Sequence, residues 1–379
     1  MGVSGVTGYL FPSRSAIGQR VVAVLMTCGS AVGLSGCLLS FTGRWALPCA
    51  LDHAWSLPGC RFAVGLDALS AVFLLPVFVL PALGAWYGLA YWRAASHPAN
   101  ARRLGAAYGA LAGAMALVVI ARDGVLFLIA WEAMALAAYF AATVEDDSKE
   151  VRRAGWIYLV ATHAGTLCLL AFFAGWRHAT GSFMLEAAPG MPVATAAPLF
   201  VLALCGFGFK AGLMPAHVWL PGAHANAPSH VSAVMSGVML KMGIYGIVRA
   251  VALLPVGDVW WGGALLVIGA ISCVGGIAFA IGQRDIKRLL AYSSIENVGI
   301  IALGLGLALT GRAADRGDWV VLGLCGALLH VWNHGLFKGL LFLNAGALIH
   351  ATGTRDMEVM GGLAKRMPRM MVLFAVGAV

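Results

Sequence analysis

Long apolar runs alternate with short polar segments along the whole chain. A transmembrane helix takes about 20 predominantly apolar residues, and ten runs reach that length. They cover residues 20–41, 66–92, 104–121, 124–143, 151–176, 196–227, 229–254, 261–283, 289–310 and 319–349. An eleventh run starts at Met370 and stops at Val379, which suggests a chain that ends inside a helix. The pattern predicts an all-α polytopic membrane protein.

Composition agrees with a membrane protein. Hydrophobic residues make up 61% of the chain and charged residues only 11%, whereas soluble domains have about 25% charged residues. The net charge of +9 comes from basic residues scattered between apolar runs. Since nucleic-acid binding needs basic residues gathered on one polar face, the sequence argues against a nucleic-acid partner and for the lipid bilayer.

The basic residues also predict an orientation, because cytoplasmic loops carry an excess of Lys and Arg. With a cytoplasmic N-terminus, the inner loops hold fifteen such residues, in segments 14–20, 93–103, 149–153, 284–288 and 355–369. The outer loops then hold six: Arg44, Arg61, Arg122, Arg177, Arg312 and Arg316. We therefore expect the inner (plasma) membrane of a cell, with the N-terminus in the cytoplasm.

Two processing questions stay open in the first 65 residues. Within residues 20–41, the segment Leu34-Ser35-Gly36-Cys37 resembles a lipoprotein cleavage site, so this run is either a first span or a removed signal, and intact mass would decide. Cys49 and Cys60 share the first outer loop and are either bridged or free. The eight cysteines show no metal-ligand spacing.

Asp67 and Asp123 stand where they can cap the helices that follow.

The most informative stretch runs from Cys205 to Arg249. Lys210 and Lys241 lie in segments apolar enough for lipid, where a bare ammonium costs about 3 kcal/mol or more. Between them the sequence predicts a helix broken at Pro215, Pro221 and Pro228. Irregular backbone at membrane depth is tolerated only in protein or against water. Lysines beside a break therefore predict an ion path.

Further titratable residues fall within the predicted spans. Glu132 is either a buried neutral carboxyl or, by default for an acid at this depth, an ion-pair or relay group. For His163 and Glu296, hydrogen bonding between helices and proton transfer are alternatives of similar weight. His217, His224 and His230 surround the predicted break and either extend a proton path or serve packing.

A second strong signal lies in the last complete span. His330, His334 and Lys338 recur every four residues, which puts them on one helix face about 6 Å apart along the axis. One ordered water can bridge each gap. Three titratable groups in one row inside lipid favour a proton wire over packing.

These residues carry a family resemblance. Residues 205–249, the motif DIKRLLAYSSIENVGIIALG and the segment HVWNHGLFKGLLFLNAGALIHATGTRDMEVMGGLAKRMP resemble the antiporter-like membrane subunits of complex I, Mrp antiporters and group 4 membrane-bound hydrogenases. LDALSAVFLLPVF and TGTRDMEVMGGL look most like the hydrogenase-4 component B and formate hydrogenlyase branch. The resemblance covers roughly residue 65 to the end.

The resemblance implies a bundle of inverted five-helix repeats, each with a broken helix. It divides the chain into N-terminal helices (1–103), a first repeat (104–254) and an incomplete second repeat (255–379). It also implies a Glu132–Lys210 ion pair as a switch, with Lys241, His330, His334 and Lys338 leading along a central axis. Gly222 departs from the family, which often has an acidic residue there.

By the same resemblance, the chain would translocate protons within a hydrogenase-4 type or related NADH/quinone oxidoreductase complex. Its partners would be other membrane and peripheral subunits. The sequence has no cysteine cluster, haem pattern or glycine-rich nucleotide loop, so we expect no cofactor, no metal and no catalytic residue in this chain. A sodium/proton antiporter of the Mrp type and a non-conducting membrane anchor are the alternatives.

Overall fold

The computed structural model describes residues 1–42 and 49–378. Arg44, which entered the orientation count, lies outside the described residues. The helices are α1 (Ala16–Phe41), α2 (Ala68–Tyr91), α3 (Ala101–Ile120), α4 (Gly124–Ala142), α5 (Lys149–Thr180), α6 (Val193–Ala211), α7 (Leu220–Asn226), α8 (Ser229–Val234), α9 (Leu240–Leu253), α10 (Val259–Ile281), α11 (Ile286–Ala313), α12 (Gly317–Thr352), α13 (Leu363–Arg366) and α14 (Pro368–Ala378). Within the described ranges, ten helical spans are long and apolar enough to cross a bilayer, so this is a multi-pass membrane protein.

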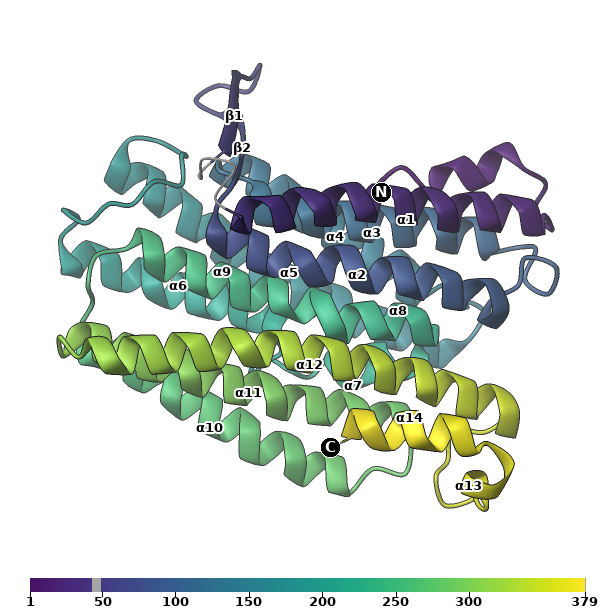
Figure 1. The fold of residues 1–379 in the computed structure, drawn as a ribbon. Helices are drawn as coiled ribbons and strands as arrows, with labels where there is room; N and C mark the ends of the chain where they lie inside the picture. Colours follow the sequence, from purple (N-terminus) through teal and green to yellow (C-terminus); the bar gives the residue numbers. More distant parts are fainter. Residues whose placement is uncertain (43–48, 379) are drawn as a thin grey trace.

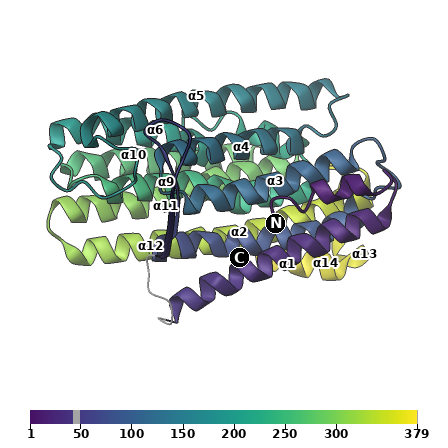
Figure 2. The ribbon, with the colours of Figure 1, turned by 90° about the horizontal axis from the view of Figure 1, so that it is seen from above.

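The long helices run side by side in one bundle with two distinct ends (Figures 1 and 2). We call the end nearer the two strands the hairpin end, and the opposite end, where α13 lies, the α13 end. The predicted caps are present: Asp67 accepts from Ser70 N at 2.8 Å, and Asp123 accepts from the amides of Val125 and Leu126. Each carboxylate satisfies amides that the first turn of a helix leaves free.

The predicted break is present between α6 and α8. Helix α6 ends at Ala211, and Gly212 follows with φ of +78°, a conformation that glycine adopts without steric cost. The chain then forms the short helix α7 and enters α8 after Pro228. A π-helical turn, η2 (Met235–Met239), lies between α8 and α9 and was not predicted.

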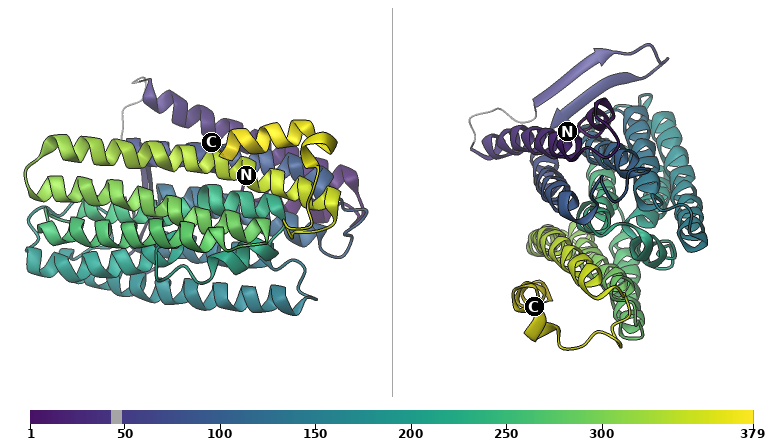
Figure 3. Two further views of the ribbon diagram at one scale, coloured as in Figure 1. Left: turned by 90° about the horizontal axis from the view of Figure 1, so that it is seen from below. Right: turned by 90° about the vertical axis from the view of Figure 1, so that its right-hand side faces the viewer.

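A two-stranded antiparallel hairpin, β1 (Cys49–Ala54) and β2 (Arg61–Leu66), projects beside the bundle (Figure 3). The pattern of apolar runs predicted no element in residues 49–65. The side chain of Cys49 lies outside the described residues, but its backbone pairs with Leu66 at the base of the hairpin, while Cys60 adjoins the tip. The question of a Cys49–Cys60 bridge therefore lies outside the described residues.

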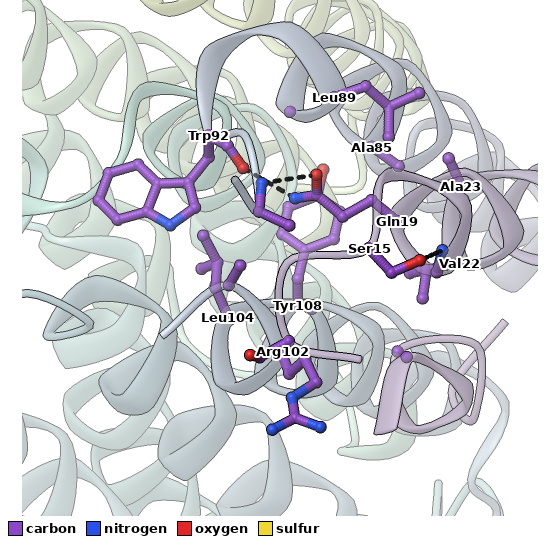
Figure 4. A pocket seen from close by; sticks show the side chains of 18 of the residues that line it. Ser15, Gln19, Val22, Ala23, Ala85, Leu89, Trp92, Arg102, Leu104 and Tyr108 are labelled. Atoms are coloured by element: carbon purple, nitrogen blue, oxygen red, sulfur yellow. Dashed lines mark hydrogen bonds between the residues drawn. The ribbon is translucent and has the colours of Figure 1, made fainter. Parts of the chain in front are cut away.

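The N-terminal segment folds back on the bundle before α1 begins. It contains the 3₁₀ helix η1 (Val6–Leu10), which packs on α3. Gln19 ties α1 to the end of α2, since its side chain donates to Trp92 O and accepts from Ala94 N, both at 2.8 Å. A cavity of about 70 Å³ lies between this segment, α1, α2 and α3 (Figure 4). His230 also lines this cavity.

Candidate functional site

Lys210 is the last residue but one of α6, directly before the break, and its side chain is 2% exposed. The Nζ atom donates to the hydroxyl of Tyr158 at 3.4 Å. It also lies over the rings of Trp131 and Tyr158, 5.5 and 5.3 Å from their centroids. Aromatic faces attract a cation, so this pocket can hold the ammonium without a carboxylate.

Glu132 does not form the expected ion pair with Lys210. Its Oε1 accepts from Thr166 Oγ1 at 2.5 Å, and its Oε2 lies 3.5 Å from His163 Nε2. The reason is helical geometry: Trp131 faces Lys210, and the next residue points about 100° away, toward α5. The Glu132 and His163 side chains are 30% and 50% exposed on the surface of the bundle.

A row of hydroxyl groups on α5 lies between these two sites. Tyr158, Thr162 and Thr166 are four residues apart and therefore share one face of the helix. Tyr158 accepts from Lys210 at one end of the row, and Thr166 donates to Glu132 at the other. All three side chains are buried. Hydroxyls both donate and accept, so they can connect the lysine to the carboxylate where a direct pair is absent.

Lys241 is fully buried in the helix that follows the break. Its Nζ donates to the main-chain carbonyl of Ser236 at 2.5 Å, five residues back. Ser236 lies in the π-helical turn η2. A π-turn widens the helix and disturbs the usual bonding of its carbonyls. The irregular turn thus supplies an acceptor to a lysine that has no acidic residue in its own helix.

A series of polar contacts lies between Lys241 and Lys338: Lys241 bonds the main-chain carbonyl of Ser236, and the Ser236 side chain makes the next contact. Ser236 Oγ lies 2.8 Å from Ser294 Oγ on α11, and Ser294 Oγ donates to Leu290 O at 2.8 Å. Lys338 Nζ on α12 donates to the same Leu290 carbonyl at 3.2 Å and bonds the hydroxyl of Ser293. The two lysines therefore share a buried polar link between α8–α9 and α12.

The predicted histidine row lies on a single face of α12. The rings of His330 and His334 are parallel within 5°, with centroids 6.2 Å apart. His330 Nε2 is 2.9 Å from Asn297 Oδ1 on α11. His334 is fully buried, and neither ring nitrogen has a partner among the described residues. Glu296, on the same turn of α11 as Asn297, is half-buried.

The three histidines of the broken region occupy different surroundings. His224, on α7, is fully buried, stacks on Phe342 at 5.0 Å between ring centroids, and has both ring nitrogens unpartnered within the described chain. His230 is enclosed by aromatic rings, the nearest being Tyr108 at 5.4 Å. His217 is only half-buried and faces the rings of Phe279 and Tyr292. The structure does not bring these histidines into one hydrogen-bonded row.

A polar vestibule of about 740 Å³ opens at the α13 end. Acidic side chains of Glu145, Asp147 and Glu150 contribute to its lining. Lys287 also lines it, is 3% exposed, and donates to the main-chain carbonyl of Ala227, at the junction of α7 and α8. The vestibule thus reaches the broken region from the α13 end of the bundle. From the sequence, Lys287 was included only among the fifteen basic residues of the inner loops that predict the orientation in the membrane.

Other residues of this network were also missed. Tyr158, Thr162, Thr166 and Ser236 gave no signal, because hydroxyl residues are common in membrane helices. Ser294 lies in the motif DIKRLLAYSSIENVGIIALG, which contributed to the family resemblance, but no role was predicted for it. The one pattern in the sequence that could have identified the α5 hydroxyls is their four-residue spacing, which matches the spacing of His330, His334 and Lys338 on α12.

Ten apolar spans, one broken beside a buried lysine, define an antiporter-like helical membrane protein. Residues 121–379 match the family described as NADH:quinone oxidoreductase/Mrp antiporter, transmembrane region, and the chain belongs to this family. The expected family resemblance is thereby confirmed.

Relatives with curated sequences agree with this membership. The chain is 41% identical over 312 residues to hydrogenase-4 component B of Escherichia coli (strain K12), covering 80% of this chain and 46% of that protein. It is 34% identical over 376 residues to formate hydrogenlyase subunit 3 of the same organism, covering 99% and 59%. The chain thus spans about half the length of the curated relatives it matches.

Solved structures share the fold. The Mrp complex from Dietzia sp. DQ12-45-1b superposes with a TM-score of 0.81 at 27% identity, over 98% of this chain and 39% of that one. The archaeal membrane-bound sulfane sulfur reductase gives 0.81 at 25% identity, over 98% and 59%. The antiporter-like architecture is therefore shared across nearly the whole chain.

Proposed function

We propose that this chain is a proton-translocating membrane subunit of a hydrogenase-4 type or related NADH/quinone oxidoreductase complex. The observation that carries the proposal is the buried link from Lys241 through Ser236 and Ser294 to the Leu290 carbonyl and Lys338. Charged groups inside a membrane bundle are costly and are typical of ion pathways. The Ser236 and Ser294 hydroxyls between the two lysines can both donate and accept and so can pass a proton, whereas the Ser236 and Leu290 carbonyls only accept and hold the ammonium groups beside these hydroxyls.

The proposed route starts at the vestibule of the α13 end, which we assign to the cytoplasmic side from the excess of basic residues there. It passes Lys287 and the broken region, and reaches Lys241 and Lys338 through the serine link. Lys210, the α5 hydroxyls and Glu132 form a side branch toward the exposed face of α5. His330 and His334 continue from Lys338 along α12. Glu296, His163, His217, His224 and His230 remain possible relay groups.

The exposed position of Glu132 supports a partner subunit. A carboxylate and an imidazole that are 30% and 50% exposed on an apolar face are unfavourable in lipid. A neighbouring subunit with a polar or cationic group would cover them. We also propose the division into residues 1–103, 104–254 and 255–379, with the last two as inverted repeats, which the broken helix in 104–254 supports.

The test uses the full-length gene product in its native membranes. Lys241→Met should reduce proton uptake by inside-out vesicles to background, while substrate oxidation by an artificial acceptor continues. Lys365→Met, which removes an exposed cation near the C-terminal end, is the matched control and should change neither. Unaltered proton uptake in Lys241→Met vesicles would contradict the proposal.

A sodium/proton antiporter subunit of the Mrp type is the second candidate, supported by the match to a family that includes Mrp antiporters. Proton flux that requires sodium and no redox substrate would favour it. Loss of complex assembly in Lys338→Met membranes, with normal proton flux in whatever complex remains, would instead favour a structural anchor.

A further inference from the structure

The polar face of α9 continues beyond Lys241 toward the hairpin end. Tyr245 and Arg249 follow at four-residue intervals, so the three side chains share one face and rise about 6 Å per step. Lys241 is fully buried, Tyr245 is 1% exposed and the Arg249 side chain is 15% exposed. The row therefore leads from the centre of the bundle to its hairpin end.

Arg249 ends this row in an ionic cluster with Asp67 and Arg122. Its Nη1 and Nη2 donate to the two Asp67 carboxylate oxygens at 2.7 and 2.9 Å. Arg122 Nη2 lies 3.2 Å from Asp67 Oδ2 and donates to Ser70 Oγ at 2.8 Å. Two guanidinium groups thus share one carboxylate, which leaves one excess positive charge in the cluster.

Tyr245 connects the cluster to the interior. Its hydroxyl donates to Val119 O at 2.6 Å and accepts from Arg249 Nε at 3.2 Å. A guanidinium has no lone pair to accept a proton and stays charged in proteins. A proton that reached Tyr245 from Lys241 could not be passed on through Arg249, and the excess charge would repel it.

We propose that the cluster Arg122–Asp67–Arg249 is an electrostatic barrier that stops protons from passing between Lys241 and the hairpin end. The inference rests on the proposed function, because a barrier is needed only where Lys241 exchanges protons. Fixed positive charge excludes protons from other membrane pores in the same way. The barrier forces protons that reach Lys241 toward Lys338 and prevents a short circuit along α9.

The experiment measures passive proton leak in vesicles of native membranes that contain the full-length gene product. A potassium gradient with valinomycin drives protons in the absence of redox substrate, and a pH-sensitive dye reports the flux. Arg249→Gln removes one unit charge about 12 Å from Lys241, so we expect leak to rise about tenfold at an effective dielectric constant of about 20. Arg249→Lys keeps the charge and should stay near the wild-type leak.

The Asp67→Asn variant distinguishes an electrostatic barrier from a cluster that only stabilises the structure. This variant breaks the same ion pairs but leaves both arginines, so a barrier predicts leak no greater than wild type. If the cluster only stabilises the structure, the Asp67→Asn and Arg249→Gln variants should show equal proton leak, which would overturn the inference. No increase in Arg249→Gln would also overturn it, with immunoblots showing equal protein in each membrane. The Lys241→Met test of driven proton uptake is separate, so failure of the proposed function is recognised independently.

Discussion

At the scale of single residues, the buried lysines are held by neutral groups. Lys210 contacts a tyrosine hydroxyl and aromatic faces, Lys241 a main-chain carbonyl, and Lys338 a carbonyl and a serine hydroxyl. No carboxylate within the described residues lies within 4.0 Å of these three ammonium groups. An acid would fix a proton in place by strong attraction. Neutral acceptors hold each ammonium group in position without this strong attraction. They also leave it in contact with neighbouring hydroxyl groups.

The serine link gives a prediction at this scale. Ser294→Ala should reduce driven proton uptake about tenfold, which is the effect of losing one hydrogen bond of about 1.4 kcal/mol along the route. Ser294→Thr keeps the hydroxyl and should retain most of the flux. The measurement is proton uptake per substrate oxidised in native vesicles. Equal uptake in the alanine and threonine variants would show that the Ser236–Ser294 contact is not used.

At the scale of elements, the sequence predicted the spans well, because hydropathy in lipid leaves few choices. Each of the ten predicted runs has a helical counterpart, and prolines marked the break between α6 and α8. The hairpin at 49–66 was missed, since its strands lie beyond the long apolar runs and follow no strict alternation. The π-turn at Met235–Met239 was missed because no residue pattern distinguishes it from an α-turn.

The buried lysines of the candidate site were predictable from the sequence, but its hydroxyl residues and its contacts were not. The cost of burying charge identified Lys210, Lys241 and Lys338 from sequence. The pairing of Glu132 depended on which way each side of α4 faces, and that is fixed by tertiary packing of Trp131 against Lys210. The link between Lys241 and Lys338 depended on a main-chain carbonyl and two hydroxyls, which hydropathy does not detect.

Close contact between α6 and α9 yields a prediction at the element scale. A Cβ at Gly243 would lie 2.6 Å from both Phe207 O and Ala211 N, so the main chain on either side of Lys210 would have to move. Gly243→Ala should therefore destabilise the protein by about 1–3 kcal/mol. Gly326→Ala, on α12, is the control, because its Cβ meets no atom within 4 Å and alanine favours helix. Thermal unfolding in detergent measures both, and equal melting temperatures would contradict the packing argument.

At the scale of the whole molecule, polar groups cross the bundle in an asymmetric way. A vestibule lined by both acidic and basic side chains opens at the α13 end, neutral donors and acceptors lie between the lysines in the middle, and an ionic cluster with excess positive charge lies at the hairpin end. The cluster also joins α2, the α3–α4 turn and α9, which are far apart in sequence, so it contributes to the stability of the fold.

This structural role predicts a pH dependence. Burial raises the pKa of Asp67, but hydrogen bonds and charge from Arg249, with Arg122, outweigh it and hold the pKa well below its ordinary value. A carboxylate with a lowered folded-state pKa stabilises the protein above its unfolded pKa of about 3.9, and that contribution is lost as the pH falls toward the folded value. Because the side chain is 27% exposed, we expect only about 1–2 kcal/mol.

The melting temperature in detergent should therefore fall more steeply below about pH 4 in the wild type than in Asp67→Asn, which has no such group to titrate. At pH 7 the asparagine variant should melt lower, since two guanidinium groups lose their shared anion. Asp52→Asn is the matched control: Asp52 pairs with Arg61 on the hairpin, both side chains are more than 40% exposed, and such pairs contribute little. If Asp52→Asn and Asp67→Asn change the melting curve equally, the Asp67 cluster does not hold the hairpin end together.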